Sequence, residues 1–354
     1  MQHKWRLFAI AAVSVMLFST SCGAAKDGAA VSSSKASSAV SISPSGTPLS
    51  QALSATAAST SASSSASSSA SSASSASSSS SSSASSSREA ASSSSEAASK
   101  TQGHSPDPVG SVIREPVITD AMRALSNKSY DTGVNESDRN EDNVPNGYIW
   151  YMNKWGKDYD AKWLMDTSKK ELYLTFDEGY EYGNTPAILD TLKAKGVKAT
   201  FFITQYFADK EPDLVRRIIA EGHTLGNHTC AHPSGGMPTL SIEAQAEDVL
   251  TLENQVREQF GYEMRYFRYP EGTFSDQSLA LMNDMGFTCI FWSFAHLDYD
   301  VNNQPDPAKS LAKMKDQLHP GAIYLLHAVS NTNTEVLPDL IDYVKQQGYT
   351  FKTF

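Results

Sequence analysis

The histidines His228 and His232, four residues apart, are the side chains of this sequence best suited to chemistry. Two carboxylates, Asp177 and Glu178, stand side by side after an apolar run, and His327 ends another apolar run. Two imidazoles and one carboxylate can hold a zinc-like ion with one position open to water. The second carboxylate and the third histidine then remain for proton transfer. The pattern therefore predicts a metal-dependent hydrolytic site.

We expect His228, His232 and Glu178 to bind the metal and Asp177 to act as the general base. A carboxylate near a cation stays ionised and can accept a proton from water whose acidity the metal has raised. His327 is the predicted general acid, which would protonate a leaving amine. Structural alternatives stay open: a histidine pair is usually structural, Asp177 could cap a helix or form an ion pair, and His327 could be a hydrogen-bonded core residue.

Asp298 and Arg268 are the candidate partners of the proton-transfer groups. A carboxylate beside a catalytic imidazole raises its pKa and fixes the orientation of its ring, which is the role expected of Asp298 toward His327. Arg268 begins the segment Arg-Tyr-Pro-Glu-Gly and could pair with Asp177 through its planar guanidinium fork. A purely structural salt bridge is the alternative for this arginine.

Short apolar runs alternate with helical patterns from Glu171 onward. The expected strands are Leu172–Phe176, Lys198–Ile203, His223–Gly226, Met264–Phe267, Phe287–Trp292, Ala322–Leu326 and Tyr349–Thr353. The expected helices are Asn184–Gly196, Pro212–Gly222, Ser241–Gly261, Ser275–Met285, Pro307–Leu318 and Glu335–Gln347. Such alternation predicts a parallel sheet that is either closed into a barrel or doubly wound.

The positions of the polar residues favour the barrel. Asp177, His228, Arg268, Asp298 and His327 each fall at or just past the carboxyl end of an expected strand. In parallel barrels that face carries the active site. Because the segment is short for an eight-fold barrel, we expect an α/β fold with a shortened, distorted, seven-stranded parallel (β/α) barrel.

The first hundred residues have a different character. Residues 1–22 combine a basic start, a short apolar core and small residues before Cys22, which is typical of a secretory signal. Cys22 is a candidate lipidation site, and an ordinary cleaved signal is the alternative. Residues 23–108 are dominated by Ser and Ala and are expected to form a disordered linker. Residues 109–170 are expected to pack on the barrel domain, 171–354, as an aromatic-rich N-terminal extension.

Charge and cysteine content exclude several classes of protein. The first 100 residues carry a net charge of +3 and the whole chain −10, which leaves −13 on the remainder. An acidic domain is poorly suited to a phosphate backbone, so nucleic acid is not an expected partner. With Cys22 assigned to the signal, Cys230 and Cys289 are too few for a disulfide framework. We interpret them as small buried residues, although a bond between them stays open.

Five ordered segments resemble the motifs of the polysaccharide deacetylase family, the family 4 carbohydrate esterases with a NodB homology domain. These segments are Thr-Phe-Asp177-Glu-Gly, His228-Thr-Cys-Ala-His232, Arg268-Tyr-Pro-Glu-Gly, Asp298-Tyr299 and Leu-Leu-His327. The resemblance extends from about Glu171 to the C-terminus and implies a metal-dependent deacetylase with the roles given above. It also implies that the backbone N–H of Glu271 stabilises the oxyanion. Tyr299, in place of the family's tryptophan, is then a predicted substrate contact.

Two departures from the family pattern narrow the resemblance. Glu178 stands where the family usually has the metal-binding aspartate, and Ala295 replaces the first aspartate of the fourth motif. These features resemble the delta-lactam-biosynthetic branch, which removes acetyl groups from muramic acid in peptidoglycan. The expected partner is a peptidoglycan strand, outside the cytoplasm, with the protein anchored in the membrane through Cys22 or secreted to the wall. Zinc is the expected metal, and cobalt, manganese and nickel are alternatives.

Two other functions stay open at this point. The same chemistry could act on chitin-type glycans or acetylated xylan. A non-catalytic protein that binds the cell wall is the alternative from another class. Loss of a catalytic residue would favour it, but Asp177, Arg268, Asp298 and His327 are all present.

Overall fold

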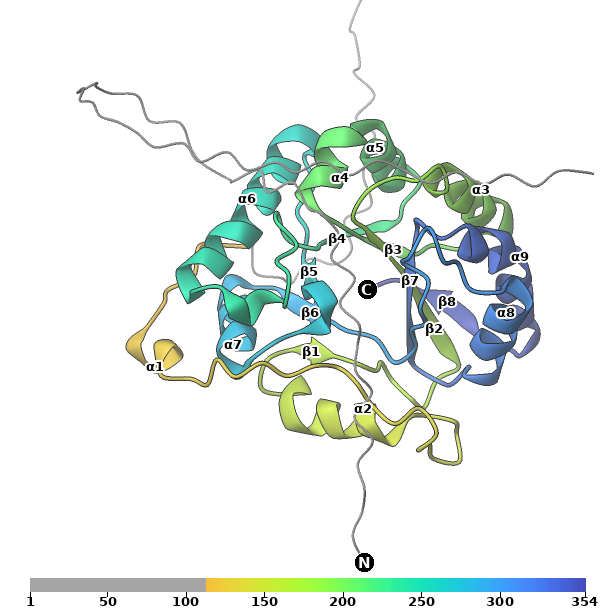
Figure 1. The fold of residues 1–354 in the computed structure, drawn as a ribbon, viewed down its shortest axis with the longest axis horizontal. Coiled ribbons are helices and arrows are strands. Elements are labelled where there is room, and N and C mark those ends of the chain that lie inside the picture. Colours follow the sequence, from red (N-terminus) through yellow and green to blue (C-terminus); the bar gives the residue numbers. More distant parts are fainter. Residues whose placement is uncertain (1–112) are drawn as a thin grey trace, which may run out of the picture. The chain divides into compact units, whose positions relative to one another are not determined.

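The computed structural model describes residues 113–354, in which a parallel sheet curls within a ring of helices (Figure 1). The strands are β1 (Ala161–Lys162), β2 (Glu171–Glu178), β3 (Thr200–Ile203), β4 (Thr224–Asn227), β5 (Tyr266–Phe267), β6 (Thr288–Ile290), β7 (Ala322–His327) and β8 (Thr350–Lys352). Their order is β1-β6-β5-β4-β3-β2-β7, and β8 pairs with the start of β2. All of these pairs are parallel.

The sheet forms a distorted barrel, which confirms the predicted fold class. The chain just past β6 closes the sheet against β7, because the N–H groups of Ser293 and Phe294 donate to the Ile323 carbonyl at 3.0 and 3.2 Å. The Leu325 N–H in turn donates to the Phe294 carbonyl at 2.9 Å. The seven expected strands are present as β2 to β8. The two-residue strand β1 was not predicted, because it is too short to show a periodic pattern.

The helices cover the outside of the sheet. They are α1 (Asp120–Arg123), α2 (Asn146–Tyr151), α3 (Thr185–Lys195), α4 (Gln205–Lys210), α5 (Pro212–Ala220), α6 (Ile242–Phe260), α7 (Asp276–Met285), α8 (Pro307–Asp316) and α9 (Asn331–Gln346). A π-helical turn spans Met152–Gly156, and 3-10 turns span Met237–Thr239 and Pro270–Gly272. Ser241 caps α6 by accepting from the Ala244 N–H, and Gly261 ends it with φ 64°.

The helix α9 begins one turn earlier than the sequence predicts. It starts at Asn331 instead of Glu335, and the Ser330 side chain accepts from the Asn333 N–H at its N-terminus. Asn and Thr are weak helix formers, so the first turn carries little helical signal. Tertiary contacts compensate, because Thr332 and Asn333 are both buried.

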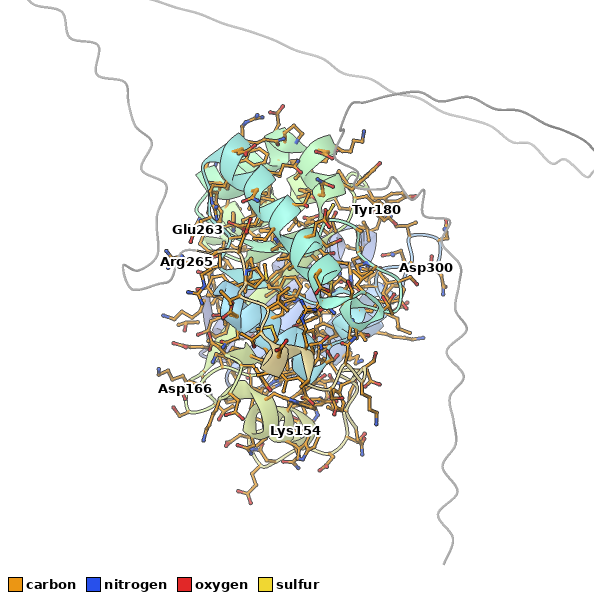
Figure 2. All side chains as sticks on the ribbon, turned by 90° about the vertical axis from the view of Figure 1, so that its left-hand side faces the viewer. Lys154, Asp166, Tyr180, Glu263, Arg265 and Asp300 are labelled. Carbon is orange, nitrogen blue, oxygen red and sulfur yellow. The ribbon has the colours of Figure 1, made fainter. Side chains whose placement is uncertain are left out.

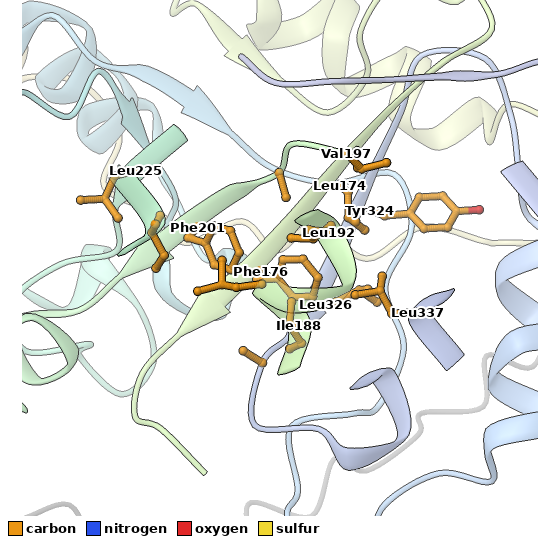
Figure 3. Packing of buried hydrophobic residues seen from close by; sticks show 14 of the residues in the cluster. Leu174, Phe176, Ile188, Leu192, Val197, Phe201, Leu225, Tyr324, Leu326 and Leu337 are labelled. Carbon is orange, nitrogen blue, oxygen red and sulfur yellow. The ribbon is translucent and has the colours of Figure 1, made fainter. Parts of the chain in front are cut away.

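The main hydrophobic core lies between the strands and the surrounding helices. Figure 3 shows Leu174 and Phe176 of β2 beside Ile188 and Leu192 of α3, and all four side chains are fully buried. The period of 3.6 residues on α3 places its apolar residues on the face that meets the sheet. Burial of side chains of this kind contributes about 1.5–3 kcal/mol each, so these contacts hold β2 against α3 and thereby position the residues at the carboxyl end of the strand.

Residues 113–170 pack on the sheet through aromatic side chains. Trp155 and Trp163 are buried at 2% and 0% exposure, and Trp163 stacks on Phe291 with ring centroids 4.2 Å apart. Trp150 is half-exposed, and the ammonium group of Lys154 lies over its ring. Core packing therefore accounts for most of these aromatic residues.

Several sequence predictions fall on residues outside the described range. The signal at 1–22, lipidation of Cys22 and the linker 23–108 belong to this part of the chain. Within residues 113–354, no helix has the length and apolarity needed to cross a membrane. Cys289 is buried as predicted, whereas Cys230 is only partly buried, and no disulfide joins the two.

A buried carboxylate on α6 makes the stability of this fold depend on pH. Glu253 is fully buried, and burial raises its pKa to about 7 despite the nearby Arg257. A carboxyl with a raised pKa binds its proton more tightly in the folded state, so stability falls as pH rises from about 4.5 to about 7. We expect Glu253→Gln to be more stable than wild type by about 3 kcal/mol at pH 8 and similar at pH 4. Urea unfolding at both pH values tests this, with the exposed Glu258→Gln of the same helix as the matched control.

Candidate active site

The candidate residues lie at the carboxyl ends of the strands. Figure 2 shows Tyr180 and Asp300, which follow β2 and β6, on one side of the molecule. Glu263 and Arg265, which precede β5, lie on the opposite side. The site therefore occupies the face that carries active sites in parallel barrels.

Strand register brings Asp177 and His327 together. They are direct partners on the neighbouring parallel strands β2 and β7. Partners in register point to the same face of a sheet, and here that face is the inside of the barrel. Each group lowers the energy of the other's charged form, since the charge of His327 contributes to the lowered pKa of Asp177 and the reverse contribution raises that of His327.

Arg268 holds Asp177 from inside the barrel. Its Nη1 donates to Asp177 Oδ1 at 2.7 Å and to Thr175 Oγ1 at 2.8 Å. Nε and Nη2 donate to the carbonyls of Ile290 and Phe291, both at 3.1 Å. The guanidinium thus meets the carboxylate through one nitrogen instead of the predicted two-pronged fork. Burial would raise the pKa of Asp177, but the charge of Arg268, helped by that of His327, lowers it, so Asp177 is ionised.

His228 and His232 form a neutral imidazole pair beside Asp177. Their ring centroids are 5.0 Å apart with an interplanar angle of 74°. His228 Nδ1 lies 2.9 Å from the Arg268 carbonyl oxygen, which can only accept, so Nδ1 carries the proton. The bare Nε2 then faces Asp177 Oδ2 at 3.6 Å. Burial lowers the pKa of His228 to about 4 and also lowers that of His232, which leaves both rings free to bind a cation.

The loop that carries the two histidines has an unusual backbone. Thr229 and His232 adopt φ values of 74° and 45°, a region that a β-branched residue such as threonine rarely enters. Side chains hold it there: Asn227 Oδ1 accepts from the Thr229 N–H at 2.9 Å, and Asp248 accepts from the two N–H groups that follow, at 2.8 and 3.0 Å. Strain of this kind clusters at functional sites. Asp248 was not predicted, because mid-helix residues of α6 give no sequence signal for such a contact.

The structure does not bring the third predicted ligand, Glu178, to the histidines. The strand β2 continues through Glu178, so this residue points to the face opposite Asp177. Both of its carboxylate oxygens accept from Thr185 Oγ1 of α3, at 3.2 Å. Burial raises the pKa of Glu178 well above its usual range, and the charge of Glu181 adds to that shift.

The structure therefore places one imidazole, that of His228, 3.6 Å from Asp177 Oδ2, with the ring of His232 beside it. Within residues 113–354, no group of three or more His, Cys, Asp or Glu side chains is arranged so that it could hold a metal ion. His228 Nε2 and Asp177 Oδ2 both offer lone pairs and repel each other, so a positive charge or a hydrogen-bond donor between them would be stabilising. So few protein donors would leave coordination positions for water and substrate.

Asp298 orients the imidazole of His327. Oδ1 of this fully buried carboxylate lies 2.8 Å from His327 Nδ1, and Oδ2 accepts from the His327 backbone N–H at 2.9 Å. A carboxylate can only accept here, so Nδ1 carries a proton and Nε2 faces the site. Burial alone would lower the pKa of His327, but the charge and hydrogen bond of Asp298 raise it. At neutral pH this favours the protonated ring.

The two predicted substrate contacts lie at the rim. Glu271 has φ 56°, and the residue after it, Gly272, has φ 64°. A Cβ at Gly272 would lie 2.5 Å from the Trp292 ring, so glycine is required at this turn. Tyr299 is half-exposed, with its ring centroid 5.7 Å from that of His327.

Comparison with known proteins gives a consistent picture. A model of the family "Polysaccharide deacetylase" matches residues 165–290. The chain is 41% identical over 203 residues to the peptidoglycan-N-acetylmuramic acid deacetylase PdaA of Bacillus subtilis, which covers 57% of this chain and 76% of that protein. It is 45% identical over 203 residues to an uncharacterized 30.6 kDa protein of Geobacillus stearothermophilus, covering 57% of this chain and 74% of the other. The solved structure of Bacillus subtilis PdaA, a family 4 carbohydrate esterase, aligns with TM-score 0.60 and 37% identity over 65% of this chain and 96% of that one.

Proposed function

Because the chain belongs to the polysaccharide deacetylase family, we propose that it hydrolyses the N-acetyl group of N-acetylmuramic acid in peptidoglycan. The observation that carries the reaction is the convergence of Asp177, His228 and His327 at one end of the barrel. The muramic acid substrate is supported by the similarity to PdaA over most of that protein's length.

We propose that His228 and His232 would hold a divalent cation beside Asp177, with zinc as the first candidate and cobalt, manganese and nickel as alternatives. When bound, such a cation supplies a Lewis acid and makes water more acidic. Asp177 accepts the proton of the attacking water while Arg268 fixes its other oxygen. His327 donates the proton on Nε2 to the leaving amine, so that acetate and a free amino sugar are the products.

We propose that the backbone N–H of Glu271 donates to the oxyanion that forms on the acetyl group, and that Tyr299 contacts the sugar. A preorganised donor of this type contributes about 2.7–4 kcal/mol to transition-state stabilisation in other enzymes. The positive φ of Glu271 supports this role, because strained backbone often serves to aim an N–H group.

Mass spectrometry of wall digests tests the proposed substrate. We expect the purified protein with zinc to release acetate from peptidoglycan and to convert muramic acid to a free amine or an internal lactam. Acetate release from N-acetylglucosamine polymers or acetylated xylan alone would assign a different glycan. Glycan binding with no acetate released under any metal would identify a wall-binding protein instead.

Measuring zinc affinity shows which of the two neighbouring carboxylates, Asp177 or Glu178, contributes to metal binding. We expect Asp177→Asn to weaken zinc affinity at least about tenfold, because the negative charge beside His228 is lost. Glu178→Gln keeps an oxygen for Thr185 and should leave the affinity within about twofold. Competition with a chromophoric chelator measures both, and His319→Leu, a buried histidine outside the site, is the control. Equal or stronger loss in Glu178→Gln would restore Glu178 as a ligand.

For location we propose action outside the cytoplasm, where peptidoglycan lies. The signal-like residues 1–22 support secretion, and Cys22 supports a lipid anchor. The Ser- and Ala-rich residues 23–108 would then be the tether to the wall, with 109–170 as an extension packed on the barrel domain, 171–354. Metabolic labelling with a fatty acid, compared between wild type and Cys22→Ser, tests the anchor.

A further inference from the structure

A buried hydrogen-bond chain continues beyond Asp298, away from the site. Asp298 Oδ2 accepts from Asn333 Nδ2 at 2.5 Å, in addition to the His327 backbone N–H. Asn333 Nδ2 also donates to the His327 carbonyl oxygen at 3.1 Å. Asn333 is 1% exposed and sits in the first turn of α9. One amide therefore bonds both the carboxylate that orients His327 and the backbone of His327 itself.

The other end of the Asn333 amide fixes a further histidine. Since Asp298 Oδ2 and the His327 carbonyl only accept, the Asn333 nitrogen must face them and its Oδ1 must face His296. His296 Nε2 lies 3.0 Å from that oxygen, so it donates. The same Nε2 is 3.5 Å from Asp298 Oδ2. Both hydrogens of the amide nitrogen are used, and its oxygen accepts from His296, so the orientation of the amide is determined.

We propose that Asn333 and His296 are positioning residues for the general acid, forming the outer half of the chain His327–Asp298–Asn333–His296. This inference rests on the proposed function, since it assigns these residues to the proton donor of that reaction. The chain prevents rotation of the Asp298 carboxylate and of the His327 backbone, and so keeps the Nδ1–H tautomer and the direction of Nε2. Asn333 reaches His327 through its backbone carbonyl, and His296 is linked to it through Asn333 and Asp298.

The surrounding charges are compatible with this role. Asp177 on β2 and Arg268, the residue after β5, lie close enough to His327 to influence its pKa, which Asp177 raises and Arg268 lowers. Burial lowers the pKa of His296, and the charge of Lys313 on α8, which donates to the Ala295 carbonyl at 3.3 Å, lowers it further. Asp298 is therefore the buried anion of the chain, and His296 is its neutral end.

Substitutions at Asn333 separate positioning from general stability. Asn333→Leu removes the amide, and we expect kcat for acetate release to fall about 10- to 100-fold with KM within about twofold. Asn333→Asp keeps the shape. Its protonated form can still donate to Asp298, whereas its ionised form repels that carboxylate. We expect Asn333→Asp to retain activity at acid pH and to lose it as pH rises, at least about one pH unit below the alkaline loss of wild type. His296→Gln, which preserves a donor, should retain more activity than His296→Leu.

A spectroscopic measurement makes the test independent of the substrate. The His327 Nδ1–H proton, bonded to a buried carboxylate, should give a downfield NMR resonance in the wild-type protein. We expect Asn333→Leu to lose this resonance and His319→Leu, a matched buried-histidine variant outside the chain, to retain it together with full activity. Full kcat and an intact resonance in Asn333→Leu would overturn the inference. Absence of acetate release by wild type would refute the proposed function instead, while the resonance would still decide the positioning role.

Discussion

Replacing Asp177 by asparagine is expected to lower acetate release by about a thousandfold or more. The carboxylate is the group placed to accept a proton from water, and positioned general bases contribute about 10²- to 10⁴-fold to rates. Its Oδ2 also faces His228 at 3.6 Å, so the substitution removes charge from the cation position. Initial rates at saturating zinc and saturating substrate isolate the loss of the base from the loss of metal affinity.

The same substitution should destabilise the fold, and this must be separated from catalysis. Arg268 is fully buried, and Asp177 is the carboxylate with which its guanidinium forms a salt bridge at 2.7 Å. Removing one partner of a buried ion pair costs about 3–5 kcal/mol. Thr175→Val is the control, since it removes another acceptor of the same Arg268 nitrogen but keeps the carboxylate. We expect it to lose stability and less than about tenfold in rate. An Asp177→Asn protein as active as Thr175→Val would refute the assigned base.

The sequence predicts the fold well because the signals are local and repeated. The periodic patterns of strands and helices depend on neighbouring residues, and so do the residues that cap helices. The structure confirms Ser241 and Gly261 as the caps of α6. Parallel pairing then places the carboxyl ends of strands at one face, which is why the sequence predicts that Asp177 and His327 lie near each other, as the structure shows.

The errors arise where tertiary contacts decide. Glu178 was predicted as a ligand because the apolar run ends before it, but β2 continues through this residue and turns its side chain to α3. Asn333 was overlooked because the first turn of α9 is poor in helix formers and is held by burial. Asp248 acts across 17 and 18 residues of chain on the histidine loop, a separation that no periodic pattern reports.

We expect the loss of activity at alkaline pH to result from deprotonation of His327. Its pKa is raised because the charge and hydrogen bond of Asp298 outweigh the effect of burial. An acid must be protonated to act, so activity should persist through neutral pH and fall as pH rises through this elevated pKa. The favourable His327–Asp298 interaction also stabilises the fold at low pH. Its contribution to stability is present below about pH 6.5 and is lost as pH rises above the raised pKa of His327 in the folded protein.

We expect His327→Ala to lower kcat about 10²- to 10³-fold and to abolish the alkaline limb of the pH profile, because the titrating acid is gone. Asp298→Asn should shift that limb to lower pH, since removing the anion removes the cause of the raised pKa. His223→Leu is the control: it alters another buried histidine, whose pKa burial lowers to about 4, and should leave the limb in place. An unshifted limb in Asp298→Asn would mean that another group limits the reaction at high pH. In that case His327 would be a structural partner of Asp298, and the proton of the leaving amine would have to come from elsewhere.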